Sequence, residues 1–176
     1  MYPVTERKLR EARFFLRKLQ EKAQTVVGDP EEFGFFLSAL LSAGRSVTFA
    51  LQVENKDGYD AWFPVWLEKQ NQEDQDLFKF MNNQRVKEVH QGGADVDKQV
   101  EFIPLTEIRP TNREHPAYGF HWFGPPGIDP PKIGRTAHYF ELGGSKQEVA
   151  AVCLRYFTLV EQLVQEFVKV HSHGAA

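Results

Sequence analysis

The segment from Phe33 to Val53 constrains the fold most, because it is apolar on two sides when it is drawn as a helix. A helix of this kind is usually buried on two faces. We therefore predict a core helix whose second face packs against another helix of the chain or against a second copy. The first stripe contains Phe33, Phe36, Leu37, Leu40, Gly44, Val47 and Leu51, and the second contains Phe35, Ala39, Ser42, Ser46, Phe49 and Val53.

Helical patterns also occur on both sides of this segment. The predicted helices run from about Thr5, the expected cap, to Val27, from Asp29 to about Glu54, from Asp60 to Gln70, from Asp74 to His90, and from a capping box at Ser145–Glu148 to about His171. Gly44 and the small serines of the second helix permit close helix packing. Gln99 to Leu142 instead alternates apolar and polar residues between prolines, which predicts strands or irregular structure.

These patterns predict a mainly α fold with a single domain over residues 1–176. Four or more helices form a bundle, and residues 99–142 form a β-containing or irregular insertion before the last helix. The chain carries a formal charge of −3, which argues against nucleic-acid binding over the whole surface and leaves room for a local basic patch. The basic stripe of the first helix, Arg7, Arg10, Arg13, Arg17 and Lys18, is interpreted as a solvated face rather than an RNA-contacting one.

Several site classes find little support in the sequence. The single cysteine, Cys153, lies in an apolar helical pattern, which indicates a buried side chain rather than a disulfide or a nucleophile. The spacing of His115, His121 and His138 fits no compact set of metal ligands, so we expect no metal and no cofactor. The first ten residues lack the apolar core of a signal peptide, and no apolar run is long enough to span a bilayer. We therefore expect a cytoplasmic protein.

The segment from Leu77 to His90 carries the one candidate active-site pair, Arg85 and His90. An arginine fits a phosphate with two parallel hydrogen bonds, and a histidine exchanges protons near neutral pH. Together they suffice for RNA cleavage without a metal, in which a 2′-hydroxyl attacks the neighbouring phosphorus. Five positions along a helix turn roughly 140° and rise roughly 7.5 Å, so a shared site needs Arg85 to curl, the helix to unwind near His90, or two copies of the chain.

Arg85, four intervening residues and His90 near a helix end resemble the signature of the HEPN superfamily. The stretch from Phe36 to Thr48 also resembles the second helix of such proteins. The resemblance covers about Thr5 to Gly92 and the last helix, and it implies a HEPN-like up-and-down bundle. It further implies a homodimeric, metal-independent ribonuclease of the toxin or defence type, whose catalytic residues are Arg85 and His90. Val86 departs from the family, which often has a polar residue after the arginine.

Two alternatives to catalysis stay open. The domain either binds RNA, a nucleotide or a protein partner such as an antitoxin without cleaving anything, or it is a bundle that only dimerises. In a purely structural role, Arg85 pairs with Glu88, Asp74 or Asp76, and His90 caps the end of its helix. Likewise Trp62, Trp66, Tyr118, Phe120 and Trp122 either stack on bases or cover a core and an interface, and the latter is more common.

Overall fold

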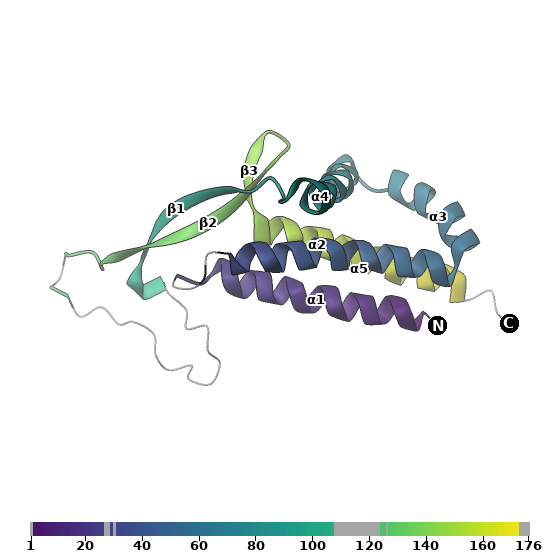
Figure 1. Ribbon diagram of the computed structural model, residues 1–176, viewed down its shortest axis with the longest axis horizontal. Helices are drawn as coiled ribbons and strands as arrows, with labels where there is room; N and C mark the ends of the chain where they lie inside the picture. Colours follow the sequence, from purple (N-terminus) through teal and green to yellow (C-terminus); the bar gives the residue numbers. More distant parts are fainter. Residues whose placement is uncertain (1, 27–28, 30, 108–123, 126, 173–176) are drawn as a thin grey trace.

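Five helices and a small antiparallel sheet make up the computed structural model, which describes residues 2–26, 29, 31–107, 124–125 and 127–172. The long helices α1 (Pro3–Ala23), α2 (Glu32–Glu54) and α5 (Val149–Ser172) pack against one another and lie side by side (Figure 1). The shorter α3 (Lys56–Glu68) follows α2, and α4 (Gln72–Gln91) is seen nearly end-on where it crosses the layer of long helices (Figure 1). The prediction of a mainly α fold with at least four helices is confirmed.

The first face of α2 forms the centre of the core. Its predicted stripe is buried from Phe33 to Leu51, apart from Phe36, which is half-buried. At Gly44 a side chain would collide with the ring of Tyr156 on α5, since a Cβ placed there would lie 2.9 Å from Tyr156 Cε1. Gly44 therefore makes room for the ring of Tyr156, and the predicted close approach of the helix backbones stays a prediction.

The second face of α2 is not covered by the described part of the chain. Phe35, Phe49 and Val53 are 62%, 56% and 68% exposed. This face therefore has no partner helix among the described residues, and a second copy as its partner stays a prediction.

The ends of α3 and α4 are fixed by local capping. The side chain of Asn55 accepts a hydrogen bond from the Gly58 backbone, so α3 starts at Lys56, earlier than the predicted Asp60. Asn71 caps α4 in the same way by accepting from the backbone of Asp74. At the other end Gly92 adopts a left-handed conformation with φ +80°, which ends the helix as predicted.

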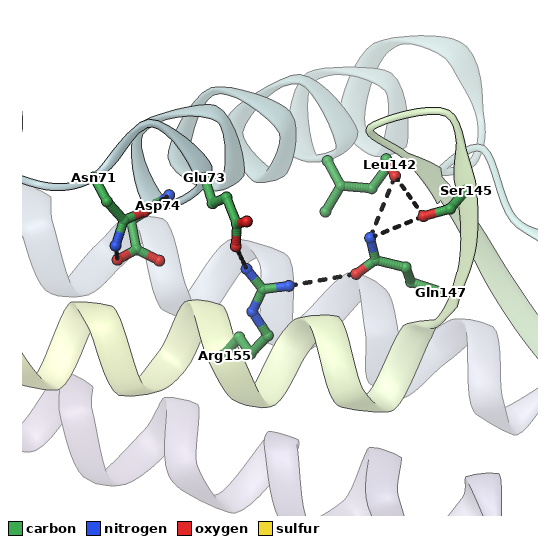
Figure 2. Close-up of polar contacts among 7 residues, drawn as sticks. All are labelled: Asn71, Glu73, Asp74, Leu142, Ser145, Gln147 and Arg155. Carbon is green, nitrogen blue, oxygen red and sulfur yellow. Dashed lines mark hydrogen bonds and ion pairs between the residues drawn. The ribbon is translucent and has the colours of Figure 1, made fainter.

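The start of α4 is also tied to α5 and to the sheet. Arg155 of α5 lies 3.8 Å from the carboxylate of Glu73 and donates a hydrogen bond to Gln147 (Figure 2). The Gln147 amide in turn donates to the carbonyl of Leu142 and to Ser145 (Figure 2). These contacts link the start of α4, the helix that carries Arg85 and His90, to α5 and the sheet.

The sheet has the order β1–β2–β3, with β1 at Asp97–Pro104, β2 at Lys132–Leu142 and β3 at Ser145–Glu148. Asp97 pairs with Tyr139 and Pro104 with Lys132, so β1 and β2 form a long antiparallel ribbon that projects from one end of the helices (Figure 1). The predicted insertion at 99–142 thus contains strands, and residues 108–123 within it lie outside the described residues. The capping box predicted at Ser145–Glu148 is wrong, because these residues pair with β2 as a third strand.

One connected hydrophobic core includes residues of all five helices and of β2. Phe140 of β2 is fully buried against Phe80 of α4, with ring centroids 5.1 Å apart. Trp66 is buried in this core and Trp62 is packed against it. Tyr118, Phe120 and Trp122 lie outside the described residues. In the described part, α2 alone is long and apolar enough to cross a membrane, but half of that stretch is buried inside the protein, as in the core helix of a soluble protein.

The first turn of α1 is capped by a residue from the end of α2. Thr5 was predicted to cap α1, but it lies inside the helix and is buried. Glu54 accepts hydrogen bonds from the backbone of Val4 (2.9 Å) and from the backbone and hydroxyl of Thr5 (3.0 and 2.7 Å). The carboxylate therefore satisfies free N–H groups and complements the helix dipole.

We expect Glu54→Gln to lower the free energy of unfolding by about 1–2 kcal/mol, because it weakens these charge-assisted bonds. Burial, the largest single influence, raises the pKa of Glu54, but the hydrogen bonds from Thr5 and Val4 together bring it below its usual 4.5. The stabilisation is thus fully present above that value and is lost as the pH falls through the lowered pKa. Urea unfolding at neutral and acid pH tests this, with the exposed Glu6→Gln as control. A loss that is as large at low pH as at neutral pH would contradict it.

Candidate functional site

Arg85 and His90 both lie on α4, which is unbroken through both positions. His90 is exposed and is followed by Gln91 before Gly92 ends the helix, so the helix does not unwind at His90. Arg85 is half-buried. With ideal helix geometry the two side chains leave α4 roughly 140° apart, so one chain does not bring them together on one face.

The acidic residues that were considered as partners of Arg85 are engaged elsewhere. Glu88 accepts a hydrogen bond from the Ala94 backbone at 2.8 Å, and Asp74 accepts one from Asn71 at 2.8 Å. Asp76 accepts from Gln72 and lies 3.9 Å from Lys79. Among the described residues none of these three pairs with Arg85, and its Nε is buried without a hydrogen-bond partner. The purely structural role proposed for Arg85 therefore lacks the ion pairs it requires.

A second arginine, Arg45 of α2, acts on the same buried tyrosine as Arg85. The positive charges of Arg45 and, more weakly, Arg85 lower the pKa of Tyr156. Burial has the larger effect and raises the pKa of Tyr156 to about 12, so the hydroxyl stays protonated at neutral pH. Arg45 donates a hydrogen bond to the Thr48 hydroxyl at 2.7 Å and forms no ion pair within the described residues. We call Arg45, Arg85 and Tyr156 the two-arginine site.

The two-arginine site has the chemistry of a phosphate-binding site. Two guanidinium groups without a carboxylate partner supply fixed positive charge and paired N–H donors, and the tyrosine supplies a neutral hydroxyl. Sequence analysis missed Arg45 and Tyr156. The one available signal was that Arg45 is the single charged residue between Glu32 and Glu54, whereas its position relative to Arg85 depends on how α4 crosses α2 and α5.

Other candidate residues are placed as follows. The thiol of Cys153 is fully buried, which raises its pKa to about 12, so it is the predicted core residue rather than a nucleophile. His138 is buried and stacks on Phe33, while His115 and His121 lie outside the described residues. No group of three metal-ligating side chains is found in the part of the chain that the structure describes.

The basic stripe of α1 is exposed and partly neutralised. Arg13 forms an ion pair with Glu161 of α5, and both Arg17 and Lys18 lie next to Glu21. The guanidinium of Arg17 also lies 5.7 Å from the centre of the Phe14 ring. These contacts agree with the interpretation of the stripe as a solvated face.

Comparisons of the chain with protein-family models, with curated proteins and with solved structures return no match. The function is therefore argued from the site itself.

Proposed function

We propose that this chain is a HEPN-like, cytoplasmic protein that binds RNA through the two-arginine site. We further propose that it cleaves RNA without a metal, with Arg85 and His90 contributed by two copies of the chain. The observation that carries the proposal is that Arg85 is half-buried with an unpartnered Nε and has no acidic partner among the described residues. Because no carboxylate neutralises Arg85 among the described residues, its fixed positive charge suits the phosphodiester of a bound RNA.

In the proposed reaction the RNA supplies its own nucleophile. The 2′-oxygen attacks phosphorus while His90 of one copy accepts its proton, and the bond from phosphorus to the 5′-oxygen breaks. His90 of the other copy gives a proton to that oxygen. Arg85 stabilises the charge that develops on the phosphoryl oxygens. The products are a 2′,3′-cyclic phosphate and a 5′-hydroxyl.

Binding of RNA or a nucleotide without cleavage is the second candidate, and the geometry of α4 supports it. Within one chain Arg85 and His90 diverge, so cleavage depends on an assembly that brings two copies together. Val86, next to Arg85, lines a cavity of about 910 Å³ with Tyr139 and Glu141 of β2 and gives no polar group to Arg85. A protein that binds RNA or a nucleotide without cleaving it still uses Arg45 and Arg85 to bind the phosphate.

The test is incubation of the protein with mixed cellular RNA in the presence of EDTA, followed by end-group analysis of the fragments. Fragments with 2′,3′-cyclic ends that form in EDTA support cleavage. RNA binding without fragments supports the second candidate. If RNA neither binds nor is cut, the proposal is wrong, and the third possibility remains, a bundle that assembles with itself or with an antitoxin or other protein.

We expect the protein to be a homodimer that buries the C-terminal end of the exposed face of α2, around Phe49 and Val53, because these are large apolar side chains in open solvent. Phe49→Glu places a charge in that interface and is expected to give a monomer by light scattering at micromolar concentration. Phe14→Glu is the matched control, since Phe14 is also exposed but lies on α1. A wild-type protein that is monomeric at high micromolar concentration would contradict both the dimer and the two-copy active site.

A further inference from the structure

A cavity of about 600 Å³ is lined by residues of α2 and α4, the helices that carry Arg45 and Arg85. One wall is the first half of α2, and the other is formed by the end of α4 and the residues that lead into β1. Its volume is in the range of small-ligand sites, and its lining combines an apolar surface with a few polar groups. The lining residues that carry the argument are Gly34, Phe35, Ser42, Glu88, Lys98 and His138.

The cavity and the two-arginine site share both walls. On α2, Ser42 lines the cavity and Arg45 follows three residues later. On α4, Glu88 lines the cavity and Arg85 precedes it by three residues. Residues three apart on a helix are neighbours on its surface, so the cavity lies about one helical turn from the arginines. This separation is close to the size of one nucleotide, with its base in the cavity and its phosphate at the arginines.

His138 lines the cavity and has an unsatisfied polar group. It is 8% exposed, its ring stacks on Phe33 with centroids 3.7 Å apart, and its Nδ1 is buried without a hydrogen-bond partner. Burial and the charge of Lys98, its partner across the β1–β2 ladder, lower its pKa to about 4. The imidazole is therefore neutral at physiological pH, with one nitrogen that donates and one that accepts hydrogen bonds.

The charges that line the cavity favour a base over a phosphate. Two carboxylates, Glu31 and Glu88, and one ammonium group, Lys98, give a net negative lining. Carboxylates only accept hydrogen bonds, so they suit the exocyclic amino group that adenine, cytosine and guanine carry and uracil lacks. The exposed ring of Phe35 offers a face on which a base can stack.

Gly34 keeps this cavity open. It lies in the first turn of α2 with no positive φ, and a Cβ added there would meet nothing within 4 Å. Neither backbone conformation nor packing thus requires glycine, although glycine is less favourable in a helix than alanine. A side chain at this position would occupy space in the cavity.

We propose that the cavity receives an unpaired RNA base with an exocyclic amino group, while the adjoining phosphate binds Arg45 and Arg85. This inference rests on the proposed function, because it takes the ligand of the two-arginine site to be RNA. It adds a preference among bases, and it identifies the residues at the cavity as those that set the preference.

The experiment measures binding of short labelled 2′-O-methyl oligonucleotides, which cannot be cleaved by attack of the 2′-oxygen, using fluorescence polarisation. Wild type is expected to bind oligo(A) and oligo(C) more tightly than oligo(U). Gly34→Leu fills the cavity and is expected to weaken oligo(A) binding about tenfold, the lower part of the range for loss of one stacked base. Ala151→Leu is the matched control, because Ala151 is exposed in the first turn of α5 and does not line the cavity.

The outcomes separate this inference from the proposed function. If Gly34→Leu binds like Ala151→Leu while Arg85→Ala loses binding, the two-arginine site binds RNA and the cavity inference is wrong. Equal wild-type affinity for oligo(A) and oligo(U) would overturn the amino-group preference. If wild type binds none of the oligonucleotides, both the proposed function and the inference about the cavity are wrong. A thermal melt of each variant confirms that it is folded.

Discussion

His90→Ala is expected to lower the rate of RNA cleavage by about 10²–10⁴, the usual loss when a residue that transfers protons is removed. The side chain lies on the exposed surface of α4, near the end of the helix, where substrate and solvent can reach it. Because an exposed side chain contributes little to packing, the free energy of unfolding should change by no more than about 0.5 kcal/mol. RNA binding through the arginines should also be retained. The measurement is the rate at which 2′,3′-cyclic ends form, together with a thermal melt.

Asn83→Ala is the control for His90→Ala, because Asn83 is exposed on α4 two turns earlier and on a similar face. It should leave the rate unchanged. A mixed dimer of His90→Ala and Arg85→Ala keeps one His90 and one Arg85, so it should not regain the wild-type rate if the two His90 side chains act together. Equal rates for wild type and His90→Ala would assign the cleavage to another site or to a contaminant.

The helices were predictable because their signals are local. The apolar stripes of α2 and the glycine after His90 depend on residues within a few turns, and the predicted end of α2 at Glu54 agrees with the structure. The strand β3 was missed although Gly143 and Gly144 stand between Leu142 and Ser145. Both glycines have positive φ, at 61° and 74°, as in a tight hairpin turn, and this turn overrides the capping box that follows it.

The site was predictable only in part. Its α4 residues, Arg85 and His90, are recognised from their spacing. The grouping of Arg85 with Arg45 and Tyr156 depends on tertiary structure, because Arg45 lies 40 residues before it and Tyr156 lies 71 residues after it. No periodic pattern in the sequence predicts that α4 crosses α2 and α5 at these positions. The same holds for His138, whose burial on Phe33 joins β2 to α2.

Arg85→Ala is expected to reduce cleavage at least as strongly as His90→Ala, since it removes charge stabilisation from the transition state, where one lost donor costs about 10²–10³. It should also weaken RNA binding, which His90→Ala should not do. Arg85→Lys should restore little activity, because an ammonium group is a point charge that does not make two parallel hydrogen bonds to a phosphate. Arg10→Ala is the control for the loss of one positive charge, as Arg10 is an exposed arginine of α1.

The stability of the Arg85→Ala variant distinguishes a role of Arg85 in binding RNA from a purely structural role. Arg85 Nε has no partner to lose, and no described carboxylate pairs with the guanidinium, so removal of the side chain breaks no ion pair within the described chain. We therefore expect a melting temperature close to that of wild type. If the variant melts far lower and no sample cuts or binds RNA, Arg85 is needed to hold α4 against Tyr156, and the resemblance of this helix to an active-site motif reflects architecture alone.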